Sequence, residues 1–285
     1  MKKLVLVGLL AAAVGCQNDN KNIERKLDLI IQKLDRQGGA APRAQRPEPD
    51  RSKTYAVPID GDPFDGPADA KVTLVKAYDY ACPYCEKVRG TMADLEQKYG
   101  KDLRVVYKQL VVHPKNAMAG ALAFCAAGKQ GKHKEMDKLL WDKGFKGRQM
   151  DMSDVAQAEA QQQPDAKGGA GKKCWDTEAG CANVVGFAQE IGLDVNKFKA
   201  DMKGECMQVV QKDMAALQQL GVAATPGFFI NGRFLSGAMP IENFVTLIDE
   251  ELKKANEKIQ QGTPQAEYYK QWVLDKGLKS LQPSG

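Results

Sequence analysis

The segment Cys82-Pro83-Tyr84-Cys85 constrains the chain most, because it lies between a β-patterned run, Val72 to Tyr80, and a helical one, Glu86 to Tyr99. At a helix N-terminus, unpaired N–H groups and the positive end of the helix dipole favour a thiolate at Cys82. Cys85 follows one helical turn later on the same side, so it can form a disulfide with Cys82 or resolve a mixed disulfide formed there. The placement of the pair predicts redox chemistry.

The competing interpretation of such a pair is a zinc site, which needs two more ligands from a second CxxC or a spaced pair of histidines. The other cysteines are scattered, and His113 and His133 are the only histidines. The sequence therefore favours a redox pair over a metal site, and a metal site over a purely structural pair. We expect no metal and no cofactor.

The first fifteen residues have the features of an export signal. Met1-Lys2-Lys3 is the charged region, Leu4 to Val14 is the apolar core, and Gly15-Cys16 is the cleavage point. The apolar core is too short to span a membrane as a mature helix. We expect residues 1–15 to be removed from an exported protein.

Ala13-Val14-Gly15-Cys16 resembles the lipobox of bacterial lipoproteins, which implies that Cys16 is lipidated and becomes the new N-terminus. Several acyl chains on one cysteine give a stable membrane anchor. The usual Leu is missing at Ala13, so cleavage by the ordinary signal peptidase, with Cys16 left as a plain thiol, is the alternative. Gln17 rather than Asp after the cysteine resembles the sorting default for the outer membrane, with the protein facing the periplasm or the cell exterior.

Composition narrows the class further. Seven cysteines minus Cys16 leave an even number in an exported chain, which favours disulfides in an oxidising compartment. A chain of 285 residues with 43% apolar content can bury a full core, as one large domain or one domain with an insertion. The net charge of +5 is dispersed without a basic stripe, which argues against a nucleic-acid partner.

Residues 16–54 are predicted to form an anchor, a short helix and a linker. Apolar residues recur there at coiled-coil spacing over about two heptads, at Ile23, Leu27, Ile30 and Leu34. A short stalk helix and a homo-oligomer both fit this pattern. Gly38 to Lys53 is rich in proline and predicts an extended linker that holds the globular part away from the membrane.

The rest of the chain alternates between strand and helix patterns. We expect strands at Tyr55–Ile59, Val72–Val75, Leu103–Leu110, Phe228–Ile230 and Arg233–Leu235, with turns at Gly61–Asp69 and a hairpin turn at Asn231-Gly232. We expect helices at Glu86–Tyr99, Ala117–Ala127, Lys132–Trp141, Ser153–Ala160, Val184–Ile191, Val195–Met202, Met207–Leu220 and Ile241–Ile259, with a loop at Gln161–Gly180. Residues 262–285 form a C-terminal tail, for which a short packed helix is one interpretation.

This order of elements predicts an α/β fold. The strands on either side of Glu86–Tyr99 make a βαβ unit and therefore a parallel pair. A strand, a βαβ unit, a helical block, then a helix, a hairpin and a final helix make a thioredoxin fold interrupted by a helical insertion. We place this domain at residues 55–261 and its insertion at about residues 113–206.

Two separated motifs in the chain point to the same protein family. They are Tyr78-Asp79-Tyr80-Ala81-Cys82-Pro83-Tyr84-Cys85 and Gly221-Val222-Ala223-Ala224-Thr225-Pro226-Gly227-Phe228-Phe229-Ile230-Asn231-Gly232-Arg233, supported by Ala70-Lys71-Val72, Gln130-Gly131-Lys132 and Gly192-Leu193-Asp194. Together they resemble the DsbA-like thiol:disulfide oxidoreductases from about Tyr55 to Ile259. The resemblance implies an attacking Cys82, a resolving Cys85 and a cis Pro226 packed beside the disulfide. It also implies exported protein thiols and disulfides as substrates, and a partner that recycles the pair.

Physical chemistry supports the cis proline independently, because proline is the residue for which a cis bond costs least. Thr225 would then present its N–H and C=O groups to an extended substrate strand. The alternative is an ordinary trans Pro226 that opens the hairpin.

Lys76 departs from the family pattern, since it occupies a position where a buried acid is common. If its side chain points toward the cysteines, its charge stabilises the Cys82 thiolate. The alternative is a lysine that reaches solvent.

The remaining cysteines are predicted to form two structural disulfides. An antiparallel pair made by the helices at Val184–Ile191 and Val195–Met202 would bring Cys181 near Cys206 and leave Cys125 with Cys174. The alternative pairs Cys174 with Cys181 and Cys125 with Cys206.

The favoured function is disulfide exchange on exported proteins, most simply as an oxidase. Pro83-Tyr84, which lacks the histidine of the strongest oxidases, and Thr225 before Pro226 are similar to the isomerase and reductase branch, which would oligomerise through the heptads. An alternative from another class is a copper-handling lipoprotein in which Cys82 and Cys85 hold Cu(I), although Met150 and Met152 are the only closely spaced methionines nearby in sequence.

Overall fold

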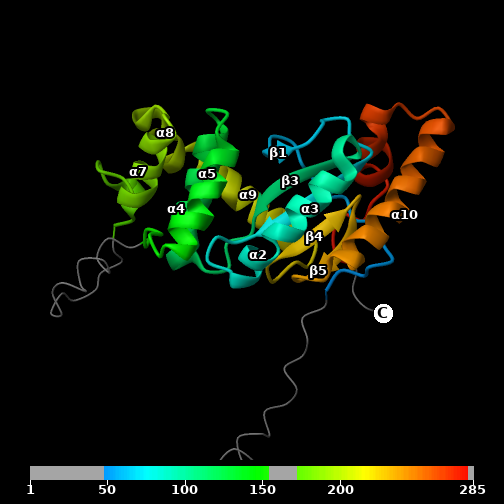
Figure 1. Ribbon diagram of the computed structural model, residues 1–285, viewed down its shortest axis with the longest axis horizontal. Coiled ribbons are helices and arrows are strands. Elements are labelled where there is room, and N and C mark those ends of the chain that lie inside the picture. The colour runs from blue at the N-terminus through cyan, green and yellow to red at the C-terminus, as the bar shows by residue number, and fades with distance from the viewer. Residues whose placement is uncertain (1–47, 154–171, 282–285) are drawn as a thin grey trace, which may run out of the picture. The chain divides into compact units, whose positions relative to one another are not determined.

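The computed structural model describes residues 48–153 and 172–281. Within these ranges the strands form one five-stranded sheet in the order β1-β3-β2-β4-β5 (Figure 1). The strands are β1 (Phe64–Asp65), β2 (Val72–Tyr78), β3 (Leu103–Gln109), β4 (Gly227–Ile230) and β5 (Arg233–Ser236). The strands β2 and β3 are parallel and the other pairs are antiparallel. The predicted fold is confirmed, a thioredoxin fold with a helical insertion.

The helices follow the predicted order. They are α2 (Pro83–Lys87), α3 (Arg89–Tyr99), α4 (Pro114–Gly128), α5 (His133–Leu139), α7 (Ala182–Glu190), α8 (Val195–Lys203), α9 (Glu205–Gln219) and α10 (Ile241–Gln260). Three 3-10 helices, η1 (Gly100–Asp102), η3 (Cys174–Asp176) and η4 (Gln265–Glu267), and two π-helices, η2 (Leu140–Lys146) and η5 (Tyr269–Leu274), complete the described ranges. The helix expected at Glu86–Tyr99 is divided at Val88 into α2 and α3. No helix of the described ranges is long and apolar enough to cross a membrane.

The central strand β2 is buried along its whole length, because helices cover both faces of the sheet. Side chains alternate between the faces of a strand. Leu74 and Tyr78 belong to the core that includes residues of α3 and α10. Val75 and Ala77 belong to a second core with the C-terminal part of α9. Lys76 shares the face of Leu74 and Tyr78, and so points toward the helices that follow the cysteine pair.

The helices α4 to α9 lie between β3 and β4 in the chain, and α4, α5, α7 and α8 gather beside the sheet (Figure 1). Helix α4 is rich in alanine and buried over most of its length, which allows α5, α8 and α9 to pack closely against it. The helices α4 to α8 correspond to the predicted insertion, and α9 leads back to the sheet, where its C-terminal part packs against β2 and β3.

The disulfides of the structure are Cys125–Cys206 and Cys174–Cys181. The favoured pairing of Cys181 with Cys206 and Cys125 with Cys174 is therefore wrong, and the alternative is correct. The helices α7 and α8 do pack together. Cys206, however, lies in the first turn of α9, which packs on α4 and so reaches Cys125.

The first strand is also misplaced in the prediction. Tyr55 makes only an isolated bridge, with Leu278 of the C-terminal tail, whereas β1 lies in a segment expected to be turns. Pro58 lacks the N–H that would continue a ladder after Val57. The tail also packs here, since the Tyr269 hydroxyl donates a hydrogen bond to the Val57 carbonyl.

The hairpin prediction is confirmed. Asn231 and Gly232 join β4 to β5 with φ angles of 43° and 83°, the left-handed backbone of a type I′ turn. The export signal, Cys16, the heptads and residues 154–171, with most of the helix expected at Ser153–Ala160, lie outside the described residues.

Candidate active site

The cysteine pair begins where β2 ends, and Asp79 holds this junction in place. Its fully buried carboxylate accepts hydrogen bonds from the backbone N–H groups of Ala81, Val112 and His113 at 2.6, 2.7 and 2.8 Å. The backbone carbonyl oxygen of Asp79 accepts a hydrogen bond from the N–H of Cys82 at 3.1 Å. Sequence reasoning did not assign Asp79 a role, although its place three residues before the first cysteine was a usable signal.

Cys82 is the N-cap residue of α2, and Pro83 follows in the first turn, where its missing N–H costs no hydrogen bond. Both cysteines are free thiols, and they are 4% and 3% exposed. Tyr84, between Pro83 and Cys85, is 62% exposed and stands at the surface. The structure therefore brings together the four residues of the predicted motif.

The two thiols are electrostatically unequal. A hydrogen bond from the Cys85 thiol, with smaller contributions from the Thr225 side chain and the backbone N–H groups of Cys85 and Tyr84, lowers the pKa of Cys82 to about 5. Burial is the largest influence on Cys85 and raises the pKa of that thiol. At neutral pH Cys82 is the thiolate and Cys85 keeps its proton.

The loop before β4 completes the site. The Thr225–Pro226 peptide bond is cis, and when Cys82 is protonated its thiol donates a hydrogen bond to the Thr225 carbonyl oxygen at 3.3 Å. The Thr225 hydroxyl oxygen is buried and has no hydrogen-bond partner among the described residues. This hydroxyl is free to donate to Cys82 once the sulfur is ionised.

Lys76 does not reach solvent, because it is only 7% exposed. Its ammonium group lies 4.5 Å from the ring centre of Tyr78 and 4.4 Å from that of Tyr107. Burial lowers the pKa of Lys76, and charges on Asp137 and Cys85 oppose that shift. The predicted effect of Lys76 on the Cys82 thiolate stays a prediction, since the interaction seen here is with Cys85.

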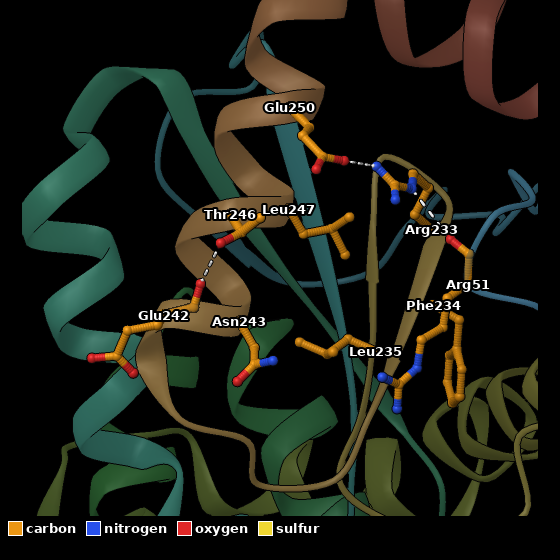
Figure 2. A pocket seen from close by; sticks show the side chains of 9 residues that line it. All are labelled: Arg51, Arg233, Phe234, Leu235, Glu242, Asn243, Thr246, Leu247 and Glu250. Atoms are coloured by element: carbon orange, nitrogen blue, oxygen red, sulfur yellow. Dashed lines mark hydrogen bonds and ion pairs between the residues drawn. The ribbon is translucent and has the colours of Figure 1, made fainter.

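Two pockets flank this region. One of about 300 Å³ lies beside Ala81, and Phe145, Met150 and Met152 are among its lining residues. Another, of about 310 Å³, lies between β5 and α10, where Arg233 bridges the Glu250 carboxylate and the Arg51 carbonyl oxygen (Figure 2). The residues that line this second pocket include no cysteine, so we do not assign it to the redox site.

The described residues hold no group of three or more histidine, cysteine, aspartate or glutamate side chains placed to bind a metal ion. The copper-handling alternative needs only the two cysteines and stays a prediction. The four cysteines of the two disulfides lie in the helical insertion.

Comparisons of this chain with known proteins agree with the fold described above. Residues 59–250 match the family model described as thioredoxin. Among solved structures, the chain is similar to BdbD from Bacillus subtilis, with a TM-score of 0.50, 22% identity and coverage of 73% of this chain and 100% of that one. It is also similar to α-DsbA1 from Wolbachia pipientis, with a TM-score of 0.51, 16% identity and coverage of 71% and 96%. At these identities the similarities show the fold.

Curated relatives in sequence are larger proteins. The chain is 30% identical over 189 residues to the Na(+)/H(+) antiporter NhaA of Herminiimonas arsenicoxydans, covering 66% of this chain and 25% of the antiporter. It is 30% identical over 195 residues to NhaA 1 of Salinispora arenicola, covering 65% and 24%. The chain thus spans about a quarter of the length of these relatives, and we do not extend their antiport activity to it.

Proposed function

Because this chain belongs to the thioredoxin family, we propose that it is a thiol:disulfide oxidoreductase that acts on exported proteins through Cys82 and Cys85. The observation that carries the proposal is the difference in pKa between the thiols of Cys82 and Cys85. The low pKa of Cys82 makes it the thiol that attacks or leaves readily, and the raised pKa of Cys85 keeps that thiol protonated until it reacts with its neighbour.

In the oxidising direction, a substrate thiolate attacks the sulfur of Cys82. The Cys82–Cys85 bond breaks, and Cys85 leaves with the electron pair. A second substrate thiolate then attacks the substrate sulfur of the mixed disulfide. The substrate disulfide forms and Cys82 leaves as a thiolate, so two electrons pass from the substrate to the enzyme. We expect Thr225, in the loop beside Cys82, to bind the substrate backbone, and its hydrogen bond with Cys82 supports this role.

The low pKa of Cys82 supports an oxidase. A stabilised thiolate stabilises the reduced enzyme, and each pKa unit is worth about 1.4 kcal/mol, or roughly 30 mV, toward being an oxidant. An isomerase or reductase that oligomerises through the heptads is the alternative direction, and its heptads lie outside the described residues. Either enzyme needs a second redox protein to recycle the pair.

The deciding measurement is the reduction potential of the pair in glutathione buffers. We expect a value closer to about −120 mV than to about −270 mV, the potentials of a strong oxidase and of thioredoxin. The oxidised protein should also form disulfides in reduced ribonuclease, and Cys82→Ala should abolish this. A potential near that of thioredoxin, together with reshuffling of scrambled ribonuclease, would instead support the isomerase or reductase.

The proposed location is the membrane surface. The lipobox-like segment that ends at Cys16 supports export and anchoring, and Gln17 favours the outer membrane of a diderm cell.

A further inference from the structure

The helical insertion supplies one wall of the pocket that lies beside the reactive cysteine. This pocket, of about 300 Å³, is lined by Tyr80 and Ala81 and, from the insertion, by residues between positions 116 and 152. Ala81 precedes Cys82 in the chain, and consecutive Cα atoms lie about 3.8 Å apart. An extended chain advances about 3.3 Å per residue. A substrate residue within about three positions of the substrate cysteine therefore reaches this pocket.

Packing fixes the floor of the pocket. Met150 lies against two glycines, because a Cβ atom added at Gly144 of η2 would lie 2.7 Å from its Cε, and one added at Gly120 of α4 would lie 3.1 Å from its Sδ. Any larger residue at these two positions would displace Met150. The Tyr80 side chain is also held, since its hydroxyl donates a hydrogen bond to Asp137 at 2.8 Å. The floor is therefore formed before any ligand arrives.

Apolar side chains around this floor remain accessible to solvent. Phe145, Met150 and Met152 are each partly exposed, and all three line the pocket. Methionine side chains are flexible and adapt to apolar groups of different shapes. Accessible apolar surface in a concave site beside a reactive group is suited to an apolar side chain of a binding partner.

The rim of the pocket is positively charged. Among the described residues that line it, Arg148 alone carries a charge. Its exposed side chain forms no hydrogen bond or ion pair with any residue that the structure describes. The turn that carries Arg148 is anchored to η2, because the N–H of Gln149 donates a hydrogen bond to the Gly144 carbonyl oxygen at 2.9 Å. The carboxylate of nearby Asp151 accepts two N–H groups at the start of α7 instead.

We propose that this pocket selects substrates by binding an apolar side chain close to the substrate cysteine, while Arg148 pairs with an acidic residue beside it. The role rests on the proposed exchange function and adds a substrate class to it, namely exported proteins whose cysteines have an apolar and an acidic residue nearby. Binding here holds the substrate sulfur near Cys82 and so raises the rate of attack without changing the pKa of either thiol.

Symmetric heptapeptides test this selection in either orientation of the substrate. The first has a central cysteine between two alanines, then leucine and glutamate on each side. The second has alanine in place of leucine, and the third has lysine in place of glutamate. Two peptide thiols reduce the Cys82–Cys85 disulfide and leave as one peptide disulfide. The rate constant is measured on the oxidised full chain, carrying Cys16→Ser, by acid quenching and mass spectrometry.

Each rate constant is divided by that of the same peptide with hydroxyethyl disulfide, which corrects for differences in the pKa of the peptide thiols. With the native pocket, the first peptide should react at least about tenfold faster than the alanine peptide and about threefold faster than the lysine peptide. Sodium chloride at about 1 M should remove the preference for glutamate and leave the preference for leucine. Dithiothreitol, which has no side chain to place in the pocket, should reduce every variant at the same rate.

Two substitutions with matched controls separate the charge from the apolar wall. Arg148→Glu should reverse the preference for glutamate over lysine, whereas Lys212→Glu makes the same change of charge at an exposed lysine of α9, outside the pocket lining, and should keep it. Met152→Gln should lower the preference for leucine at least about threefold, and Met207→Gln, at a partly exposed methionine of α9, should not. Circular dichroism checks that each variant folds, and if Met152→Gln does not, the comparison rests on Arg148→Glu.

The proposal is overturned if Arg148→Glu and Lys212→Glu discriminate between the peptides alike, since the preference would then reflect net charge. It is also overturned if the native pocket gives the leucine and alanine peptides the same corrected rate constant. A disulfide that dithiothreitol reduces and no peptide reduces would instead contradict the exchange function on protein substrates. The two failures are therefore distinguishable.

Discussion

In its protonated form, the Cys82 thiol donates a hydrogen bond to the Thr225 carbonyl oxygen at 3.3 Å, although 143 positions separate the two residues in the chain. The bond joins the start of α2 to the loop that leads into β4. It places the reactive sulfur against the segment that would receive the substrate backbone. The reactive sulfur and the loop that is proposed to bind the substrate therefore meet at Thr225.

The first prediction concerns the Thr225 hydroxyl. Thr225→Val removes a donor to the thiolate and should raise the Cys82 pKa by about one unit, the value of one hydrogen bond. Thiolate absorbance at 240 nm as a function of pH measures the shift. Thr225→Ser keeps the hydroxyl and should titrate like the wild type. An unchanged pKa in Thr225→Val would show that the hydroxyl does not reach the sulfur.

The second prediction concerns selective alkylation. The pKa of Cys82 is about 5 and that of Cys85 is raised, so iodoacetamide at pH 6 should label Cys82 alone. Peptide mapping by mass spectrometry locates the label, and Cys82→Ser should remain unlabelled. Preferential modification of Cys85 would reverse the assignment of the two roles.

A third prediction follows from linkage. The folded-state pKa of Cys82 lies below its unfolded value, so ionisation adds stability to the reduced protein as the pH rises above about 5, and this stability is lost as the pH falls through it. The oxidised protein has no such group. Between pH 5 and pH 8 the free energy of unfolding of the reduced form should therefore rise relative to the oxidised form, by a few kcal/mol (at most about 4). Urea titrations of both forms test this, and a constant difference would contradict it.

The fold was predictable where local chemistry decides it. Asn231 and Gly232 both tolerate the left-handed backbone of a type I′ turn, so this dipeptide alone predicts a hairpin. The misplaced first strand and the disulfides depended on tertiary contacts. Tyr55 pairs with Leu278, more than two hundred residues away, and Cys206 meets Cys125 because α9 packs on α4. No local pattern carries that information.

The site was predictable to a similar extent. The motif itself identified Cys82 and Cys85, and the resemblance identified Pro226. The sequence left two alternatives for Lys76, a side chain that points toward the cysteines and one that reaches solvent, and only the packing of the neighbouring helices, which encloses it, decides between them. The role of Asp79 depends on Val112 and His113, which the fold brings to its carboxylate.

The fourth prediction compares the two structural disulfides. Cys125–Cys206 spans 81 positions and Cys174–Cys181 spans seven, so chain entropy assigns them about 4.5 and about 2.4 kcal/mol of stabilisation. Replacing both cysteines of the first pair by alanine should lower the free energy of unfolding about twice as much as replacing both of the second. Urea denaturation gives both values. Equal losses would mean that local packing outweighs loop length.

The fifth prediction concerns Cys16, which lies outside the described residues. The wild-type protein should partition into the detergent phase, and Cys16→Ser should move it to the aqueous phase. Mass spectrometry of the mature N-terminus provides the control. An unlipidated Cys16 at that terminus would mean that the ordinary signal peptidase cleaves the chain.

The Cys125–Cys206 bond also has a consequence for how each new molecule matures. If the chain is exported, as proposed, a new copy arrives with these thiols reduced and needs an oxidant before α4 and α9 are joined. If the protein is an oxidase, older copies supply that oxidant, and the newly made chain is one of its own clients. Production of the active form would then be autocatalytic, and a cell that starts without any mature copy should show a lag before activity accumulates.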